Sequence, residues 1–76
     1  MAIKKEILQK RLGERIAYLR TTKGLNQTEL AHYCNKDRQS INRLEKGKVN
    51  PSIYYLLQIS NALEINMSEL FNFDLK

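Results

Sequence analysis

The segment DRQSINRLEKGK concentrates side chains that could bind another molecule through hydrogen bonds and positive charge. Ile41 and Leu44 are its only large apolar residues, and their spacing of three places them on one face of a helix. The segment therefore predicts a short helix that buries a narrow apolar stripe and offers its donors outward. The donors opposite that stripe, or at its edge in the first turn, are Arg38, Gln39 and Arg43.

These three donors match the edges of DNA bases. An arginine guanidinium can hold O6 and N7 of guanine with two parallel bonds, and a glutamine amide can do the same for N6 and N7 of adenine. Arg38 and Gln39 stand at the amino-terminal end of the predicted helix, which is the end that reaches base edges in helix-turn-helix proteins. We therefore predict that Arg38, Gln39 and Arg43 contact bases of double-stranded DNA.

The net charge of +5 is distributed unevenly along the 76 residues. Residues 1–48 hold twelve of the thirteen Lys and Arg residues but only five of the eight acids, which gives +7. Residues 49–76 carry −2. This asymmetry favours a polyanion on one surface and a different partner on another, although charge alone fits a solvated basic surface equally well.

Other functional classes find little support in the composition. His32 and Cys34 are the only residues of their kinds, and without clustered carboxylates or a glycine-rich phosphate loop they make no plausible catalytic set. We therefore expect no enzyme, no metal site, no cofactor and no small-molecule ligand. No apolar run approaches the roughly 18 residues that cross a membrane. A lone cysteine suits a reducing cytosol, so a cytoplasmic protein is expected.

The periodicity is helical throughout and predicts an all-α chain that forms one domain over residues 1–76. Gly24 and Gly47 can end helices in the left-handed conformation, and Asn35 is the non-glycine residue that best tolerates it. Five helices are expected, at about residues 4–23, 27–34 and 38–46, then after Ser52 and after Asn66.

Side chains that cap helices and apolar side chains that face inward support these five elements. Asn26 with Glu29, and Asn66 with Glu69, have the spacing of a capping box, while Asp37 and Ser52 are good N-cap residues. The inward faces of the first and fourth helices are predicted to carry Leu8, Leu12, Ile16 and Leu19, and Ile53, Leu56, Leu57, Ser60 and Leu63, respectively.

Residues 20–71 resemble the helix-turn-helix domain of the phage repressor and Cro type, also called the XRE family. The core of the resemblance is NQTELAHYCNKDRQSINRLEKGKVNPS, with the small Ala31 where two helices cross. Asn35 stands at the turn, where the family usually has glycine, and Lys36 departs from the apolar residue that usually follows. The resemblance implies a compact five-helix lambda-repressor-like bundle with its core in residues 12–71.

The resemblance also implies further roles. Gln27 matches a residue that bonds a DNA phosphate and braces the recognition helix. Arg20 and Glu45 match a partly buried ion pair that ties the first helix to the third. Phosphate or supporting contacts are implied for Gln27, Ser40, Asn42, Lys46, Lys48 and Asn50.

Four aromatic residues in the weakly acidic part of the chain suggest a protein interface. Tyr54 and Tyr55 cannot both be core residues if Ile53, Leu56 and Leu57 face inward. Repressors of this type commonly pair through their carboxyl-terminal helices, which implies a homodimer; the alternative is a monomer whose aromatic side chains cover its own first helix. The interface candidates are Tyr54, Tyr55, Phe71 and Phe73.

These features predict a sequence-specific transcriptional regulator, a repressor or autoregulator, that reads a near-palindromic operator. Two alternatives keep the DNA-binding mode and change its biological setting: an antitoxin, or a controller of a restriction–modification system. A third is a protein-interaction module that keeps the fold and binds no DNA.

Overall fold

The structure is a computed structural model that describes residues 2–75. The two ends of the predicted domain, Met1 and Lys76, lie outside the described residues. The described chain contains four α-helices and one 3-10 helix, and no strand. The elements are α1 (Lys5–Thr22), α2 (Gln27–Tyr33), α3 (Arg38–Glu45), α4 (Ile53–Leu63) and the 3-10 helix η1 (Met67–Phe71).

The predicted last helix is present with 3-10 geometry, so the described residues contain four α-helices and one 3-10 helix in place of the five helices expected. The predicted cap by Asn66 is absent, since its side chain makes no capping hydrogen bond. Arg15 on α1 supplies a physical reason. Its Nε donates to the backbone oxygen of Glu69 at 2.9 Å, and its terminal nitrogen to the Glu69 carboxylate at 3.3 Å. Glu69 is thereby drawn toward α1, and its carboxylate serves that contact instead of a capping box.

The other helix boundaries follow the predicted chemistry. Asn26 and Glu29 form both hydrogen bonds of a capping box, each 2.8 Å long. The hydroxyl of Ser52 accepts from the backbone N–H of Tyr55 at 3.0 Å and so caps α4. Asn35 adopts a φ of 57°, as expected for a left-handed turn residue. These local signals decide where each helix begins and ends.

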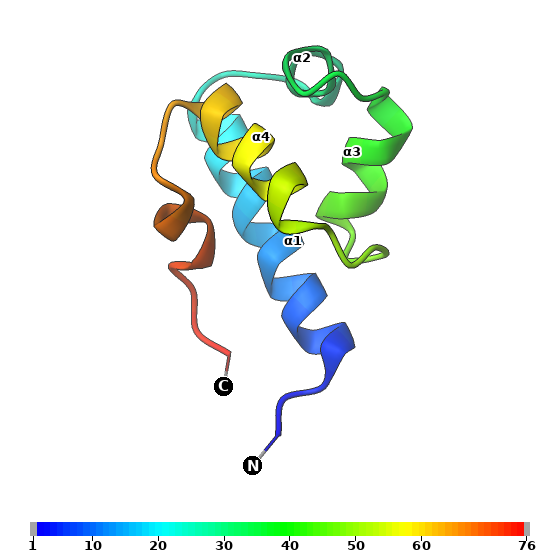
Figure 1. The fold of residues 1–76 in the computed structure, drawn as a ribbon, viewed down its shortest axis with the longest axis vertical. Helices are drawn as coiled ribbons and strands as arrows, with labels where there is room; N and C mark the ends of the chain where they lie inside the picture. The colour runs from blue at the N-terminus through cyan, green and yellow to red at the C-terminus, as the bar shows by residue number, and fades with distance from the viewer. Residues whose placement is uncertain (1, 76) are drawn as a thin grey trace.

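The arrangement of the helices places α3 at the side of the molecule. In Figure 1, α1 runs along the long axis with α4 over it, α2 lies across one end, and α3 stands beside α1. The core lies among all five elements and is formed by Leu12, Ile16, Leu30, Ala31, Cys34, Ile41, Leu44, Leu56, Ile59, Leu63 and Leu70.

Three apolar residues predicted to face inward are exposed instead. Leu8 precedes the part of α1 that packs into the core, and its exposed fraction is 39%. On α4, Ile53 is 78% exposed and Leu57 39% exposed. The buried face of this helix is Leu56, Ile59, Ser60 and Leu63, so the helix is rotated away from the predicted direction.

Candidate nucleic-acid interface

The third helix is attached to the fold by a narrow apolar stripe. Ile41 is 0% exposed and Leu44 is 1% exposed, while no other residue of α3 is buried. Asp37 caps the helix, because its Oδ1 accepts from the backbone N–H of Ser40 at 2.8 Å. The hydrogen bonds from Ser40 lower the pKa of the Asp37 carboxyl. A charged cap therefore holds the first turn, where base-reading side chains are predicted.

The predicted base-contact residues all point to solvent. Arg38, Gln39 and Arg43 are exposed, and the opposite side of the same two turns is buried. Their donors are thus available to an external ligand. Ser40 and Asn42, on the flanks of the helix, are partly buried.

The loop after α3 adds positive charge beside these donors. Gly47 takes a φ of 72°, so the chain turns sharply there, and Lys46 and Lys48 on either side of it are exposed. Asn50 is exposed as well. The loop residues therefore extend the donor surface from the helix toward the amino terminus of α4.

A hydrogen-bonded network behind α3 contains the ion pair implied by the family resemblance. Arg20 binds the Glu45 carboxylate through two nitrogens, at 2.6 and 3.0 Å, and also donates to the backbone oxygen of Leu25 at 2.8 Å. Gln27 donates to Glu45 at 3.0 Å, and Asn42 donates to Gln27 at 3.3 Å. The network joins α1, α2 and α3. A bidentate arginine–carboxylate pair of this kind holds a defined geometry.

This network agrees with the supporting role predicted for two of the contact residues. Gln27 and Asn42 are partly buried, and their amides are engaged with each other and with Glu45. Both residues therefore position α3. The bond between Gln27 and Asn42 was not predicted, because residues fifteen positions apart carry no local signal of contact.

Close backbone packing also fixes α3 against α1. A Cβ added to Gly13 would lie 2.5 Å from the carbonyl oxygens of Leu44 and Glu45, so only glycine permits this approach. The sequence carries no signal for this role of Gly13, since a glycine within a helix indicates a close approach only once its neighbour is known.

A cleft of about 300 Å³ adjoins α3, lined by side chains that include Arg43, Asn50 and Tyr55. The ammonium of Lys36 lies 4.8 Å from the centre of the Tyr55 ring, within cation–π range. Lys36 therefore covers an aromatic face in the position where the family usually has an apolar residue. The adjacent Cys34 is buried, and burial raises the pKa of its thiol.

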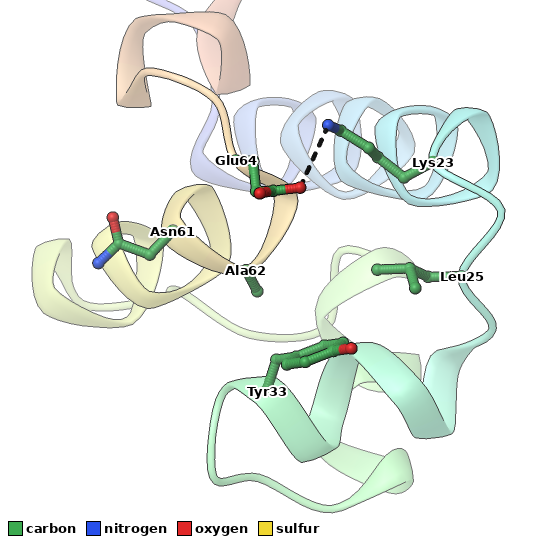
Figure 2. A pocket seen from close by; sticks show the side chains of 6 residues that line it. All are labelled: Lys23, Leu25, Tyr33, Asn61, Ala62 and Glu64. Atoms are coloured by element: carbon green, nitrogen blue, oxygen red, sulfur yellow. Dashed lines mark ion pairs between the residues drawn. The ribbon is translucent and has the colours of Figure 1, made fainter.

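A second cleft, of about 360 Å³, lies away from α3. Figure 2 shows Leu25 and Tyr33 facing Ala62 of α4, beneath the Lys23–Glu64 ion pair, in which the nitrogen and oxygen are 3.8 Å apart. No residue of α3 lines this cleft, so it is separate from the donor surface. Within residues 2–75, no three His, Cys, Asp or Glu side chains gather in a way that could hold a metal ion.

The four aromatic interface candidates divide into two pairs. Tyr54 and Phe71 are exposed, at 67% and 46%, whereas Tyr55 and Phe73 are partly buried against the core. The expectation that Tyr54 and Tyr55 differ in burial is confirmed. On the outer face of α4, Tyr54 lies with Ile53 and Leu57, two apolar residues that are exposed although they are predicted to face inward.

Comparisons with known proteins agree with this geometry. A helix-turn-helix family model matches residues 16–70. The chain belongs to the helix-turn-helix family of the phage repressor and Cro type. An uncharacterized HTH-type transcriptional regulator from Archaeoglobus fulgidus is 38% identical over 79% of this chain and 86% of its own length. Another uncharacterized HTH-type transcriptional regulator, y4dJ from Sinorhizobium fredii, is 33% identical over 83% of this chain and 82% of its own length.

A solved structure gives the same result for the fold. The restriction-modification controller protein C.AhdI from Aeromonas hydrophila superposes with a TM-score of 0.81 and 38% sequence identity, covering 83% of this chain and 91% of that protein. This helix-turn-helix protein is therefore a DNA-binding transcription regulator. None of the helices in residues 2–75 has both the length and the apolar character needed to cross a membrane.

Proposed function

We propose that this helix-turn-helix regulator reads a specific DNA sequence with α3 in the major groove. The observation that carries the proposal is the separation of the two sides of α3: Ile41 and Leu44 are buried, while the three predicted base-contact residues are exposed. The recognition helix of this motif enters the major groove by its amino-terminal residues. Arg38 and Gln39 occupy that end, and Arg43 lies one turn further on.

The sequence-independent part of the binding is assigned to the loop after α3. Exposed Lys46, Lys48 and Asn50 lie where they can neutralise or hydrogen-bond phosphates, and Ser40 flanks them on the helix. Phosphate contacts of this kind fix the position of a protein on the duplex, while base contacts provide specificity. Gln27 supports α3 through its bond to Glu45, and Asn42 through its bond to Gln27.

We further propose that two copies bind together as a homodimer. The outer face of α4 exposes Ile53, Tyr54 and Leu57, and Phe71 of η1 is also exposed. These residues belong to the part of the chain that carries −2. A two-fold dimer would place two recognition helices about 34 Å apart and read half-sites separated by one helical turn. A near-palindromic operator follows, with repression or autoregulation as the outcome.

Selection of bound duplexes from a random pool, with the purified protein, tests these proposals together. We expect an enriched sequence with two inverted half-sites about one helical turn apart. Arg38→Ala and Arg43→Ala should each relax preference at one position, at a cost of about 1–3 kcal/mol. If single alanine substitutions of Arg38, Gln39 and Arg43 all leave specific binding intact, the proposed base-reading role of α3 is wrong.

A controller of a restriction–modification system is the second candidate, favoured by the 38% identity to C.AhdI over 91% of that protein. It shares the proposed DNA-binding mode, as would an antitoxin. A neighbouring gene for an endonuclease or a toxin would distinguish these settings from a general regulator. In each of them, we propose, the chain acts by binding rather than catalysis, in the cytoplasm where it meets the genome.

A protein-interaction module that binds no DNA is separated from these candidates by a salt titration. When a protein neutralises several phosphates, the logarithm of its affinity falls linearly with the logarithm of the salt concentration, with a slope of about −0.9 per phosphate. We expect a slope corresponding to several phosphates. Affinity that does not change with salt would favour the interaction module.

A further inference from the structure

The first part of α1 precedes the residues that the family model matches, which begin at Ile16. This part nevertheless touches the loop between α3 and α4. The Gln9 side-chain nitrogen donates to the backbone oxygen of Gly47 at 3.1 Å. A Cβ added to Gly47 would lie 2.7 Å from the Cα of Lys10, so the two backbones are in direct contact. The second turn of α1 is thus packed against the loop proposed to bind phosphates.

Three exposed lysines surround this contact. Lys46 and Lys48 flank Gly47 in the chain, and Lys10 lies across from it on α1. Among residues 2–75, none of the ion pairs includes any of the three. Neighbouring positive charges without acidic partners repel each other. The mutual repulsion of these lysines is unfavourable, and an external anion would relieve it.

The helical register places Lys10 on the side of α1 that packs against α3. Gly13 marks that side, because it meets the carbonyl oxygens of Leu44 and Glu45. Lys10 is three residues earlier and so lies on the same side, one turn away. At Lys10, α1 has passed the carboxyl end of α3 and packs against the loop that follows it. Glu6, one further turn back, is exposed and acidic.

We propose that Lys10 binds a backbone phosphate of double-stranded DNA adjacent to the phosphates bound by Lys46 and Lys48. The first helix then extends the contact with the duplex by one phosphate, beyond the helix-turn-helix and its following loop. Gln9 is the positioning residue, because its bond to Gly47 keeps α1 and the loop together. A phosphate contact adds affinity for every sequence and no base preference. The inference rests on the proposed DNA-binding mode.

The salt dependence of binding to one fixed duplex tests this role. The slope of log affinity against log salt should decrease in magnitude by about 0.9 in Lys10→Ala, as for the loss of one phosphate contact. Affinity at low salt should fall several-fold, and the ratio of affinities for the selected and a mismatched duplex should not change. Lys10→Arg keeps the charge and should keep the slope. Ethylation interference should lose one phosphate from the wild-type pattern in Lys10→Ala.

Lys23→Ala is the matched control, because it removes the same charge from the far end of α1, where Lys23 pairs with Glu64. Its slope should equal that of the wild type. An unchanged slope in Lys10→Ala, together with a reduced slope in Lys48→Ala, would overturn the role of Lys10 and leave the DNA-binding mode intact. Equal reductions in Lys10→Ala and Lys23→Ala would also overturn it, since they would reflect net charge alone. A wild-type protein whose binding ignores salt would overturn both proposals.

Discussion

The helices α3 and α4 are neighbours in the chain, and they present opposite chemistry to solvent. The outer face of α3 carries Arg38, Gln39 and Arg43, all polar or charged. The sequence of α4, IYYLLQISNAL, contains no charged residue, and its outer face exposes Ile53 and Tyr54. Each helix buries one stripe, so packing leaves the outer face free to serve a partner. A charged face suits a polyanion, and an apolar face suits another protein surface.

The two helices also differ in how they are held. α4 buries three large apolar side chains, Leu56, Ile59 and Leu63. α3 buries only two, and the bidentate pair between Arg20 and Glu45 adds to its attachment. A helix that must leave most of its surface to a ligand has little apolar area for packing, and a directional polar contact fixes its position instead.

The largest expected effect comes from removing that polar contact. Glu45→Ala leaves the guanidinium of Arg20, whose side chain is 13% exposed, without its carboxylate. We expect the free energy of unfolding to fall by about 3 kcal/mol, as for other ion pairs broken by removing one partner. Chemical denaturation measures it. The double variant Arg20→Met/Glu45→Leu is the control and should recover most of the stability. A loss below about 0.5 kcal/mol in Glu45→Ala would show that α3 does not depend on this pair.

Base preference should change on substitution in the proposed base-reading face of α3 and should not change on substitution in the outer face of α4. Arg43→Ala is expected to cost about 1–3 kcal/mol of specific binding energy, with little change in affinity for non-specific duplexes. Competition binding against single-base variants of the selected duplex measures both. Asn61→Ala, an exposed polar substitution on α4, should leave the base preference unchanged. A similar effect of both variants would remove the functional distinction between the two helices.

The outer face of α4 is expected to control self-association instead. Tyr54→Asp places a charge on a side chain that is 67% exposed, so the free energy of unfolding of the monomer should change by less than about 0.5 kcal/mol. The dimer dissociation constant, measured by sedimentation equilibrium, should rise by at least about tenfold, which corresponds to about 1.4 kcal/mol. Tyr18→Asp, at another exposed tyrosine on α1, is the matched control. Equal dimerisation in wild type and Tyr54→Asp would exclude this face as the interface.

The smallest effect is expected at Tyr55, on the inner side of α4. Its hydroxyl is buried and has no hydrogen-bond partner among residues 2–75, and burial raises the pKa of this tyrosine to about 12. Tyr55→Phe should therefore leave the free energy of unfolding unchanged or raise it by up to about 1 kcal/mol.

The raised pKa also determines the sign of a pH effect. The folded state holds the Tyr55 proton more tightly than the unfolded state, so this contribution is complete below pH 10 and is lost as the pH rises toward about 12. Denaturation curves across that range should show a weaker alkaline loss in Tyr55→Phe than in the wild type. Clear destabilisation of Tyr55→Phe at neutral pH would mean that the hydroxyl has a partner.

Local signals in the sequence were sufficient to predict most of the helix boundaries. The capping residues Asn26, Asp37 and Ser52 act through atoms within three residues, so their effect does not depend on the rest of the fold. The same holds for the positive φ of Asn35. The failed prediction at Asn66 has a distant cause, because Arg15 on α1 binds Glu69.

Predictions of which side of a helix is buried were less successful where several sides are apolar. In α3 only one stripe is apolar, and the predicted burial of Ile41 and Leu44 is confirmed. In α4 eight of the eleven positions are apolar or aromatic, so periodicity could not select one face. Contacts of α4 with α2 and η1 decide its rotation, which buries Ile59 and exposes Ile53.

The sequence by itself determined the helix-turn-helix, its caps and the residue types on the outer face of α3, because these depend on neighbours within one or two turns. The tertiary structure alone decided the Gln27–Asn42 bond, the approach of Gly13 to α3 and the placement of Lys10 beside Gly47. Each of these joins residues that are distant in the chain. Their proximity depends on how whole helices pack, and helix packing is a property of the complete core.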